Sequence, residues 1–442
     1  MDRQKEFQEC LEYREEHRDT WNSLVDLFRE WPEGPERSQA YQKLAKRLED
    51  PDWKDRYRVM YYEPDHPLWP LVRFLNLNLF LNDDGTIPVP TDLEHITHIG
   101  FNHAQRIPHY ERLEFIAYTS NFAHLEGLHL DQSFNLTNFH LLERMKNLKE
   151  LYIKDIYNLT CFHGIEKLVH LERLELGIEP VDVDTFKYID LYGGLILAAD
   201  LPKLRHLSLT FWPMLDKLWF DVARYFPKLQ SLNLSNSSIQ DLRSLSELVG
   251  LTDLKLWSCK QIQTLTGLEK LSQLTTLDLS RCTIDTLSPL RELEQLSKLH
   301  LSYATIEDLS DLRELKELTE LHLIKYQGSS IPFVKEMHKL QWLNLNSSPN
   351  ITDIEALSEL QELETLSLGE ASLVEPKPLL ELPGLRSLDL SFDPKQIPVL
   401  KQLKQLKHLS LSTKGNEELK TVAESYHTEL QDALPEVELF IW

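Results

Sequence analysis

Leucine recurs along most of this chain at a nearly fixed spacing. The six-residue pattern LxxLxL, in which x is usually polar, occurs 13 times, once with Ile in place of the last Leu. The copies begin at Leu125, Leu148, Leu171, Leu204, Leu229, Leu251, Leu274, Leu296, Leu318, Leu340, Leu363, Leu385 and Leu406. Ten of the twelve successive steps are 21 to 23 residues long, and the other two, after Leu171 and Leu204, are 33 and 25. A period that is kept this long indicates repeating structural units.

Each unit predicts a short strand and a segment that returns to the start of the next strand. The fourth and sixth positions of the pattern are apolar and alternate with polar neighbours, which is typical of a strand with one buried face. The return segment 283–296 has inward apolar side chains every three residues, which favours 3₁₀ or extended turns over a regular helix. These are Ile284, Leu287, Leu290, Leu293 and Leu296. One unit cannot bury its own leucines, so successive units must stack with parallel strands.

The 22-residue unit LxxLxLxxxxIxxLxxLxxLxx, as in 274–295, resembles the short leucine-rich repeats of bacterial internalins and of the protein-phosphatase regulatory subunit. The resemblance covers about 125–415 and implies an α/β solenoid, a leucine-rich-repeat horseshoe with a parallel concave β-sheet. That family usually has Asn at the ninth position of the repeat. In seven of the 13 copies the ninth position holds a small residue that fits the same inward corner, namely Ser133, Ser237, Cys259, Cys282, Ala304, Ser348 and Ala371. Internalins also carry a signal peptide and a wall-anchoring tail, which this sequence does not display, so adhesion to a host receptor is not implied.

The regions outside the clear repeats predict two end caps. Residues 1–84 do not repeat, and they carry one apolar helical stripe (Trp21, Leu24, Val25, Phe28 and Trp31) and a second helix from Ser38 to Leu48. We expect 1–84 to be a helical N-terminal cap, with an independent interaction domain as the alternative. The solenoid then spans 85–415, with degenerate first coils before Leu125.

The C-terminal segment 416–442 predicts a closing helix and strand. Asn416 is a suitable N-cap for a helix that carries Leu419, Val422, Ala423, Tyr426, Leu430 and Leu434, and VELFIW follows as a strand. Two repeats run long, because they include the segments 179–202 and 217–226. The second segment predicts a true helix. Insertions of this kind in repeat proteins often serve binding, and an inert bulge is the alternative.

Charge and cysteine content narrow the function. The chain has 47 Lys and Arg against 70 Asp and Glu, a net charge of −23. This excess disfavours nucleic acid and anionic membranes and favours a protein partner with a basic surface, although it also serves solubility. No segment predicts a signal peptide or a membrane span, so we expect a cytoplasmic protein that is monomeric when free. Cys259 and Cys282 lie one repeat apart and are interpreted as two buried thiols rather than a disulfide.

The sequence offers little catalytic chemistry. It contains no nucleophile elbow, HExxH, Walker loop, GxGxxG after a strand, or cysteine pair, so we expect no enzyme, no cofactor and no metal. One set of residues is an exception. Asp278, His300 and His322 occupy the fifth position of three successive repeats and should lie on adjacent strands about 5 Å apart. Such a set suits a transition metal or a general base, which leaves a metal-dependent enzyme as the alternative function.

The same strands carry large side chains suited to protein recognition. These are Trp257, Arg281, Tyr303, Lys325 and Trp342, and with Asp278, His300 and His322 they form the predicted partner-binding patch. The sequence therefore predicts a non-catalytic scaffold that binds a macromolecule through its concave face. It could be an inhibitor or immunity-type protein, an adaptor, or a bacterial effector delivered to another cell.

Overall fold

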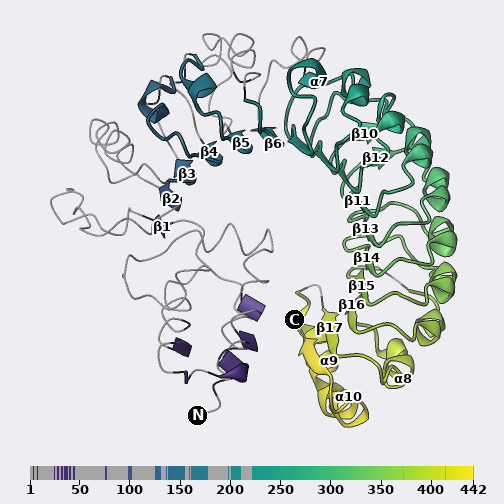
Figure 1. Ribbon diagram of the computed structural model, residues 1–442. Coiled ribbons are helices and arrows are strands. Elements are labelled where there is room, and N and C mark those ends of the chain that lie inside the picture. Colours follow the sequence, from purple (N-terminus) through teal and green to yellow (C-terminus); the bar gives the residue numbers. More distant parts are fainter. Residues whose placement is uncertain are drawn as a thin grey trace. The chain divides into compact units, whose positions relative to one another are not determined.

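The computed structural model describes most of the repeat region and little of the N-terminal part (Figure 1). The described residues are scattered positions of 3–44, then 75–76, 98–101, most of 125–177, 198, 201–210, and 222–441 without 372 and 414. The chain divides into two compact units, Met1–Leu204 and Arg205–Trp442. Each unit is described by itself below.

The first unit contains a sheet of parallel strands in sequence order. They are β1 (Leu75–Asn76), β2 (His98–Phe101), β3 (Gly127–Leu130), β4 (Glu150–Lys154) and β5 (Arg173–Gly177). The 3₁₀ turns η3 (His140–Leu142) and η4 (Ile165–Lys167) follow β3 and β4. The strand β2 lies before the first clear repeat and pairs in parallel with β3.

Near the N-terminus, the described apolar side chains are buried. The rings of Phe7, Phe28 and Trp31 contact one another, with centroids 5.7 to 6.0 Å apart. Leu24 and Leu44 are fully buried. These residues agree with the predicted apolar stripes, whereas Trp21, Val25 and Ser38 lie outside the described residues. Residues 35–37 are already helical, so the prediction that the second helix begins at Ser38 is wrong. The role of this region as a cap and the boundaries at 84 and 415 stay predictions.

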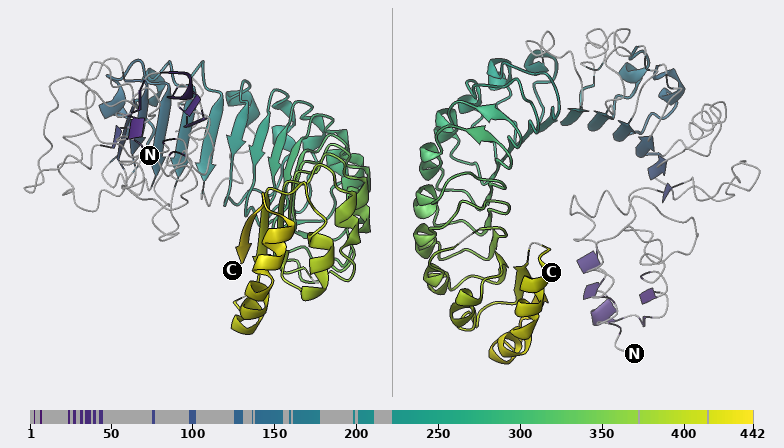
Figure 2. Two further views of the ribbon diagram at one scale, coloured as in Figure 1. Left: turned by 90° about the horizontal axis from the view of Figure 1, so that it is seen from below. Right: turned by 180° about the vertical axis from the view of Figure 1, so that it is seen from behind.

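The second unit is a solenoid with a regular parallel sheet. Its strands are β6 (His206–Thr210), β7 (Ser231–Asn233), β8 (Asp253–Lys255), β9 (Thr276–Asp278), β11 (Lys298–His300), β13 (Glu320–His322), β14 (Trp342–Asn344), β15 (Thr365–Leu368), β16 (Ser387–Ser391), β17 (His408–Ser412) and β18 (Glu438–Ile441). Two further short strands, β10 (Thr283–Ile284) and β12 (Thr305–Ile306), pair with each other. Within this unit the main strands lie side by side along the inner side of an arc and the return segments along its outer side (Figures 1 and 2).

The return segments are the predicted 3₁₀ turns. They are η8 (Arg243–Glu247), η9 (Leu268–Lys270), η10 (Ser288–Glu292), η11 (Ser310–Glu314), η12 (Pro332–Glu336), η13 (Glu355–Glu359), η14 (Lys377–Glu381) and η15 (Pro394–Gln396). The side chains of Ile284, Leu287, Leu290, Leu293 and Leu296 are at most 2% exposed, which confirms the three-residue spacing of inward positions. Between strand and turn, the leucines of each repeat fill one continuous core. Leu277 and Leu299, on β9 and β11, are fully buried.

Two ninth-position side chains, those of Cys259 and Cys282, donate to backbone carbonyls of the preceding repeat. The thiol of Cys259 lies 3.1 Å from the carbonyl oxygen of Leu234, and that of Cys282 lies 3.1 Å from the carbonyl oxygen of Leu256. Both are free cysteines, as predicted. Burial raises the pKa of Cys282 to about 12 and that of Cys259 in the same direction, so both thiols stay protonated and act as weak donors.

The helical segments differ in detail from the sequence prediction. The helix expected over 217–226 is present as α7 (Val222–Tyr225), the part of that segment described as helical, and α8 (Ile397–Leu400) lies in a later return segment. The single closing helix is two helices, α9 (Glu417–Ser425) and α10 (His427–Ala433), separated at Tyr426. Asn416 caps α9 as predicted, because its side chain accepts from the N–H groups of Glu418 and Leu419. The long segment 179–202 lies almost entirely outside the described residues. Among the described helices, none combines the length and apolarity needed to cross a bilayer.

Candidate binding face with a histidine–glutamate cluster

The strands of the second unit present their third and fifth repeat positions on the concave side, because side chains two residues apart point to the same face. Parallel pairing aligns these positions from strand to strand. His300 of β11 is in register with both Asp278 of β9 and His322 of β13, and Lys298 is in register with Glu320. The residue types at these two positions therefore decide which side chains meet.

Directly after each strand, the eighth position of the repeat makes a sharp turn. Arg281, Tyr303 and Lys325 have positive φ angles of 60°, 59° and 68°. Their N–H groups donate to the carbonyls of Ser302, Ile324 and Asn346 at 2.8 to 2.9 Å, each in the next repeat. A left-handed backbone is unfavourable for side chains of this size. The hydrogen bonds to the next repeat stabilise this left-handed conformation and fix the direction in which each side chain leaves the backbone.

These turns bring four predicted residues into one stack. The guanidinium of Arg281 lies between two rings, 5.3 Å from the centroid of Trp257 and 5.1 Å from that of Tyr303. The ammonium of Lys325 lies 5.7 Å from the centroid of Tyr303. All distances are within the range of cation–π attraction. We call Trp257, Arg281, Tyr303 and Lys325 the cation–π stack. Tyr303 is 44% exposed, so the stack is open to solvent.

A second row of rings crosses the strands. The rings of His300 and His322 lie 4.4 Å apart, and that of His322 lies 5.9 Å from Trp342 on β14. Trp342 is 46% exposed. Seven of the eight predicted residues of the patch thus fall into two groups, the cation–π stack and this row of rings, and Asp278 belongs to neither.

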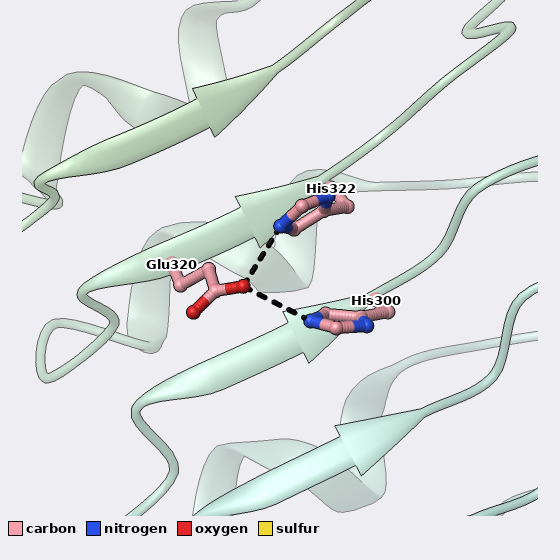
Figure 3. A group of neighbouring side chains, drawn as sticks. All are labelled: His300, Glu320 and His322. Atoms are coloured by element: carbon pink, nitrogen blue, oxygen red, sulfur yellow. Dashed lines mark hydrogen bonds and ion pairs between the residues drawn. The ribbon is translucent and has the colours of Figure 1, made fainter. Parts of the chain in front are cut away.

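The two histidines share one carboxylate oxygen (Figure 3). Oε1 of Glu320 lies 3.3 Å from Nε2 of His300 and 2.9 Å from Nε2 of His322. The other oxygen, Oε2, is paired with Nζ of Lys298 at 2.9 Å. The imidazoles of His300 and His322 and the ammonium of Lys298 hold the pKa of Glu320 well below its usual range. The carboxylate is therefore ionised at any physiological pH, at the centre of three nitrogen donors.

The sequence predicts a cluster of Asp278, His300 and His322, and this prediction is wrong about the acidic residue. Oδ1 of Asp278 accepts a hydrogen bond from the N–H of Ser280 at 2.9 Å, which turns the side chain toward its own chain. Among the described residues, the group of possible metal ligands comprises His300, Glu320 and His322, whose ligand atoms all lie within 4.8 Å of one another. Glu320 takes the place that the sequence assigned to Asp278.

Glu320 was missed because only the fifth position of each repeat was compared between strands. Glu320 occupies the third position, two residues before His322 on the same strand. The period of two that defines a strand places both side chains on one face. A comparison of the third and fifth positions together would have found the cluster.

In the first unit two of the fifth-position side chains, those of His129 and Tyr152, are buried, whereas Glu175 is half-buried. His129 and Tyr152 are each 2% exposed, and their rings stack with centroids 5.7 Å apart. At these two residues the concave position is therefore not accessible to a partner. In the second unit, the corresponding side chains from Lys255 to Ser410 are exposed or half-buried.

Comparison with known proteins supports the fold. No family model and no curated protein matches the chain. A solved leucine-rich-repeat protein of Leptospira interrogans covers 87% of this chain and 93% of its own, with 21% identity and a TM-score of 0.53. An internalin of Listeria monocytogenes covers 62% of this chain and 76% of its own, with 23% identity and a TM-score of 0.47. The chain thus has the leucine-rich-repeat fold that its repeats predict.

Proposed function

We propose that this chain is a non-catalytic protein-binding scaffold whose contact surface is the concave side of the second unit around β8 to β14. One observation supports the proposal above all others, namely the cation–π stack. Four large side chains from consecutive repeats are stacked in order on a surface open to solvent. Arginine and aromatic side chains of this kind dominate the energy of protein interfaces.

The stack is also suited to binding because it is ordered before a partner arrives. Association costs about 0.5–1.5 kcal/mol for each flexible side chain that it immobilises. Here the backbone hydrogen bonds at Arg281, Tyr303 and Lys325 and the contacts between their side chains restrict this freedom in advance. A partner would therefore meet a surface that is already arranged.

The charges of this protein set two requirements for its partner, one at long range and one at the contact surface. The chain as a whole carries −23, which attracts a basic protein from a distance. The contact surface itself has four cations (Lys255, Arg281, Lys298 and Lys325) and three anions (Asp253, Asp278 and Glu320) at its third, fifth and eighth positions. We propose a basic protein that also places carboxylate or carbonyl oxygens against the stack, as an inhibited enzyme or toxin could.

We further propose that the protein acts in the cytoplasm as a monomer. Cys161, Cys259 and Cys282 are free thiols, which fits a reducing compartment. An adaptor would use the same face as an inhibitor, and the identity of the partner distinguishes these roles.

The test uses the purified protein to capture a partner, followed by affinity measurements with the purified pair. Tyr303→Asn is the informative variant, because Asn tolerates the left-handed conformation of this position better than Tyr and so preserves folding. The loss of the ring contacts with Arg281 and Lys325 offsets part of this gain, so we expect a melting temperature close to that of the wild type and an affinity at least 10-fold lower. Glu292→Ala, on the outer turn η10, is the matched control and should bind as the wild type does. If Tyr303→Asn and Trp342→Ala both bind normally, the concave face is not the contact surface and the proposal fails.

A further inference from the structure

We propose that His300, Glu320 and His322 bind one divalent transition-metal ion, with zinc the best fit. The site is formed by two adjacent strands, His300 on β11 and Glu320 and His322 on β13 (Figure 3). Two imidazoles and one carboxylate are a known set of three protein ligands for zinc. Nitrogen ligands also select against magnesium and calcium, which prefer oxygen.

The distances between the ligand atoms suit a tetrahedral ion. Bonds of 2.0–2.1 Å at the tetrahedral angle place two ligand atoms about 3.3 Å apart. Oε1 of Glu320 lies 3.3 Å from Nε2 of His300 and 2.9 Å from Nε2 of His322. The third separation, between the two imidazoles, is at most 4.8 Å. Only a small rotation of the rings is therefore needed to close the triangle around an ion.

A bound metal ion would replace the hydrogen atoms that now lie between Oε1 of Glu320 and the Nε2 atoms of His300 and His322. Because the ionised carboxylate of Glu320 can only accept, the Nε2 of each histidine carries the proton that it donates to Oε1 in the metal-free protein. In the metal-bound form both Nε2 lone pairs point to the ion, and each neutral imidazole carries its proton on Nδ1. Both Nε2 atoms already converge on one point (Figure 3).

Lys298 and the sheet hold the cluster in place. The ammonium of Lys298 is paired with Oε2 of Glu320 at 2.9 Å, which leaves Oε1 facing the histidines. The strands β11 and β13 are hydrogen-bonded neighbours in the middle of the sheet, so the Cα positions of the three ligands are fixed relative to one another. Binding would require little reorganisation, which favours affinity.

The site would keep one open position toward the solvent. The side chains of His300, Glu320 and His322 are 32%, 19% and 17% exposed, so the ion would be accessible from the concave side. Three protein ligands leave the fourth position of a tetrahedral ion to water. This proposal concerns the isolated chain and stands or falls independently of the protein partner.

The experiment is a titration of chelator-treated, dialysed protein with Zn²⁺ by calorimetry, together with Co²⁺ titration followed by visible absorption. We expect one Zn²⁺ per chain, cobalt bands typical of a tetrahedral ion, and no saturable binding of Mg²⁺. His322→Ala removes one ligand. Glu320→Gln keeps the shape of the side chain but removes its charge. Each should weaken Zn²⁺ binding at least about 10-fold and abolish the cobalt bands.

His408 provides a matched control on the same face. Its Nδ1 lies 2.8 Å from Oε2 of Glu438 on the neighbouring strand, so this is a histidine–glutamate pair without a second histidine. His408→Ala should bind Zn²⁺ with the stoichiometry and affinity of the wild type. The proposal is overturned if the wild type binds no stoichiometric Zn²⁺, or if Glu320→Gln and His322→Ala, verified as folded by circular dichroism, bind it as the wild type does.

Discussion

Two neighbouring stretches of the second unit have the same backbone arrangement and differ in their concave side chains. In the central strands, β8 to β14, the concave positions carry Trp257, Arg281, Tyr303, the two histidines and Trp342. In the later strands, β15 to β17, the fifth position holds Ser367, Asp389 and Ser410. Both stretches have the same parallel register and the same buried leucines. The repeating positions therefore specify the fold, and the positions free to vary specify what the surface can bind.

The largest expected effect is a loss of stability that should be equal in the two stretches. Leu299 of β11 and Leu388 of β16 occupy the same repeat position and are 0% and 1% exposed. Leu299→Ala and Leu388→Ala should each destabilise the protein by about 2–5 kcal/mol through the cavity left behind. Urea denaturation of both variants provides the measurement. A large loss in one stretch and almost none in the other would mean that the two do not share one type of core.

The next effect should separate the stretches, because it concerns binding. Trp342→Ala removes an exposed ring from the central strands, and Ser367→Ala changes the next strand, β15, at the residue in register with Asn344. If Trp342 anchors the partner, its loss should weaken binding by about 2 kcal/mol, whereas Ser367→Ala should have little effect. Affinity for the captured partner, measured by calorimetry, tests this. Equal losses for both variants would extend the contact surface into the later strands.

The sequence predicts the common part of the two stretches better than the part that differs. The buried leucines and the 3₁₀ turns follow from the repeat period alone. The same spacing of apolar residues determines which side chains are buried and how the chain returns to the next strand. His300 and His322 were found because they share a repeat position, and Glu320 was missed because it occupies a different one. The contact of Trp257 with Arg281 also joins different repeat positions, the seventh and the eighth. Contacts between unlike positions depend on side-chain directions at each turn, which the period does not encode.

The burial of His129 and Tyr152 shows a second limit of the repeat pattern. The pattern places these side chains on the same side of the sheet as His300 and His322. It contains no information about what else packs against that side in the first unit. The repeat pattern also gives no information on the segment from Asn416 onward. The apolar spacing there continues through Tyr426, so it could not predict that α9 and α10 are separated at this residue.

A smaller effect should report the energy of the cation–π stack in the folded protein. Arg281 and Ser347 both occupy eighth positions with positive φ angles, 60° and 56°, so alanine in either position has the same backbone cost. Arg281→Ala also removes two ring contacts. At about 0.5–1 kcal/mol for each contact, Arg281→Ala should be more destabilising than Ser347→Ala by about 1–2 kcal/mol. Urea denaturation of both variants measures the difference, and equal stabilities would show that the stack contributes nothing to folding.

The smallest effect is a pH dependence expected in the later strands. Burial raises the pKa of Asp389, outweighing the hydrogen bonds from Ser410 and Asn346 that lower it. The folded protein therefore binds the proton more tightly than the unfolded chain does, and this carboxyl costs stability as pH rises from its unfolded pKa, near 3.8, through its higher folded pKa. Above that window the cost is complete. Asp389→Asn cannot ionise, so near neutral pH it should unfold at a slightly higher urea concentration than the wild type. Below the unfolded pKa, where Asp389 is protonated in both states, the two proteins should be equally stable. The measurement is the urea midpoint of the wild type and of Asp389→Asn from acidic to neutral pH. If Asp389→Asn is less stable than the wild type at neutral pH, the fold favours the charged carboxylate and the prediction is wrong.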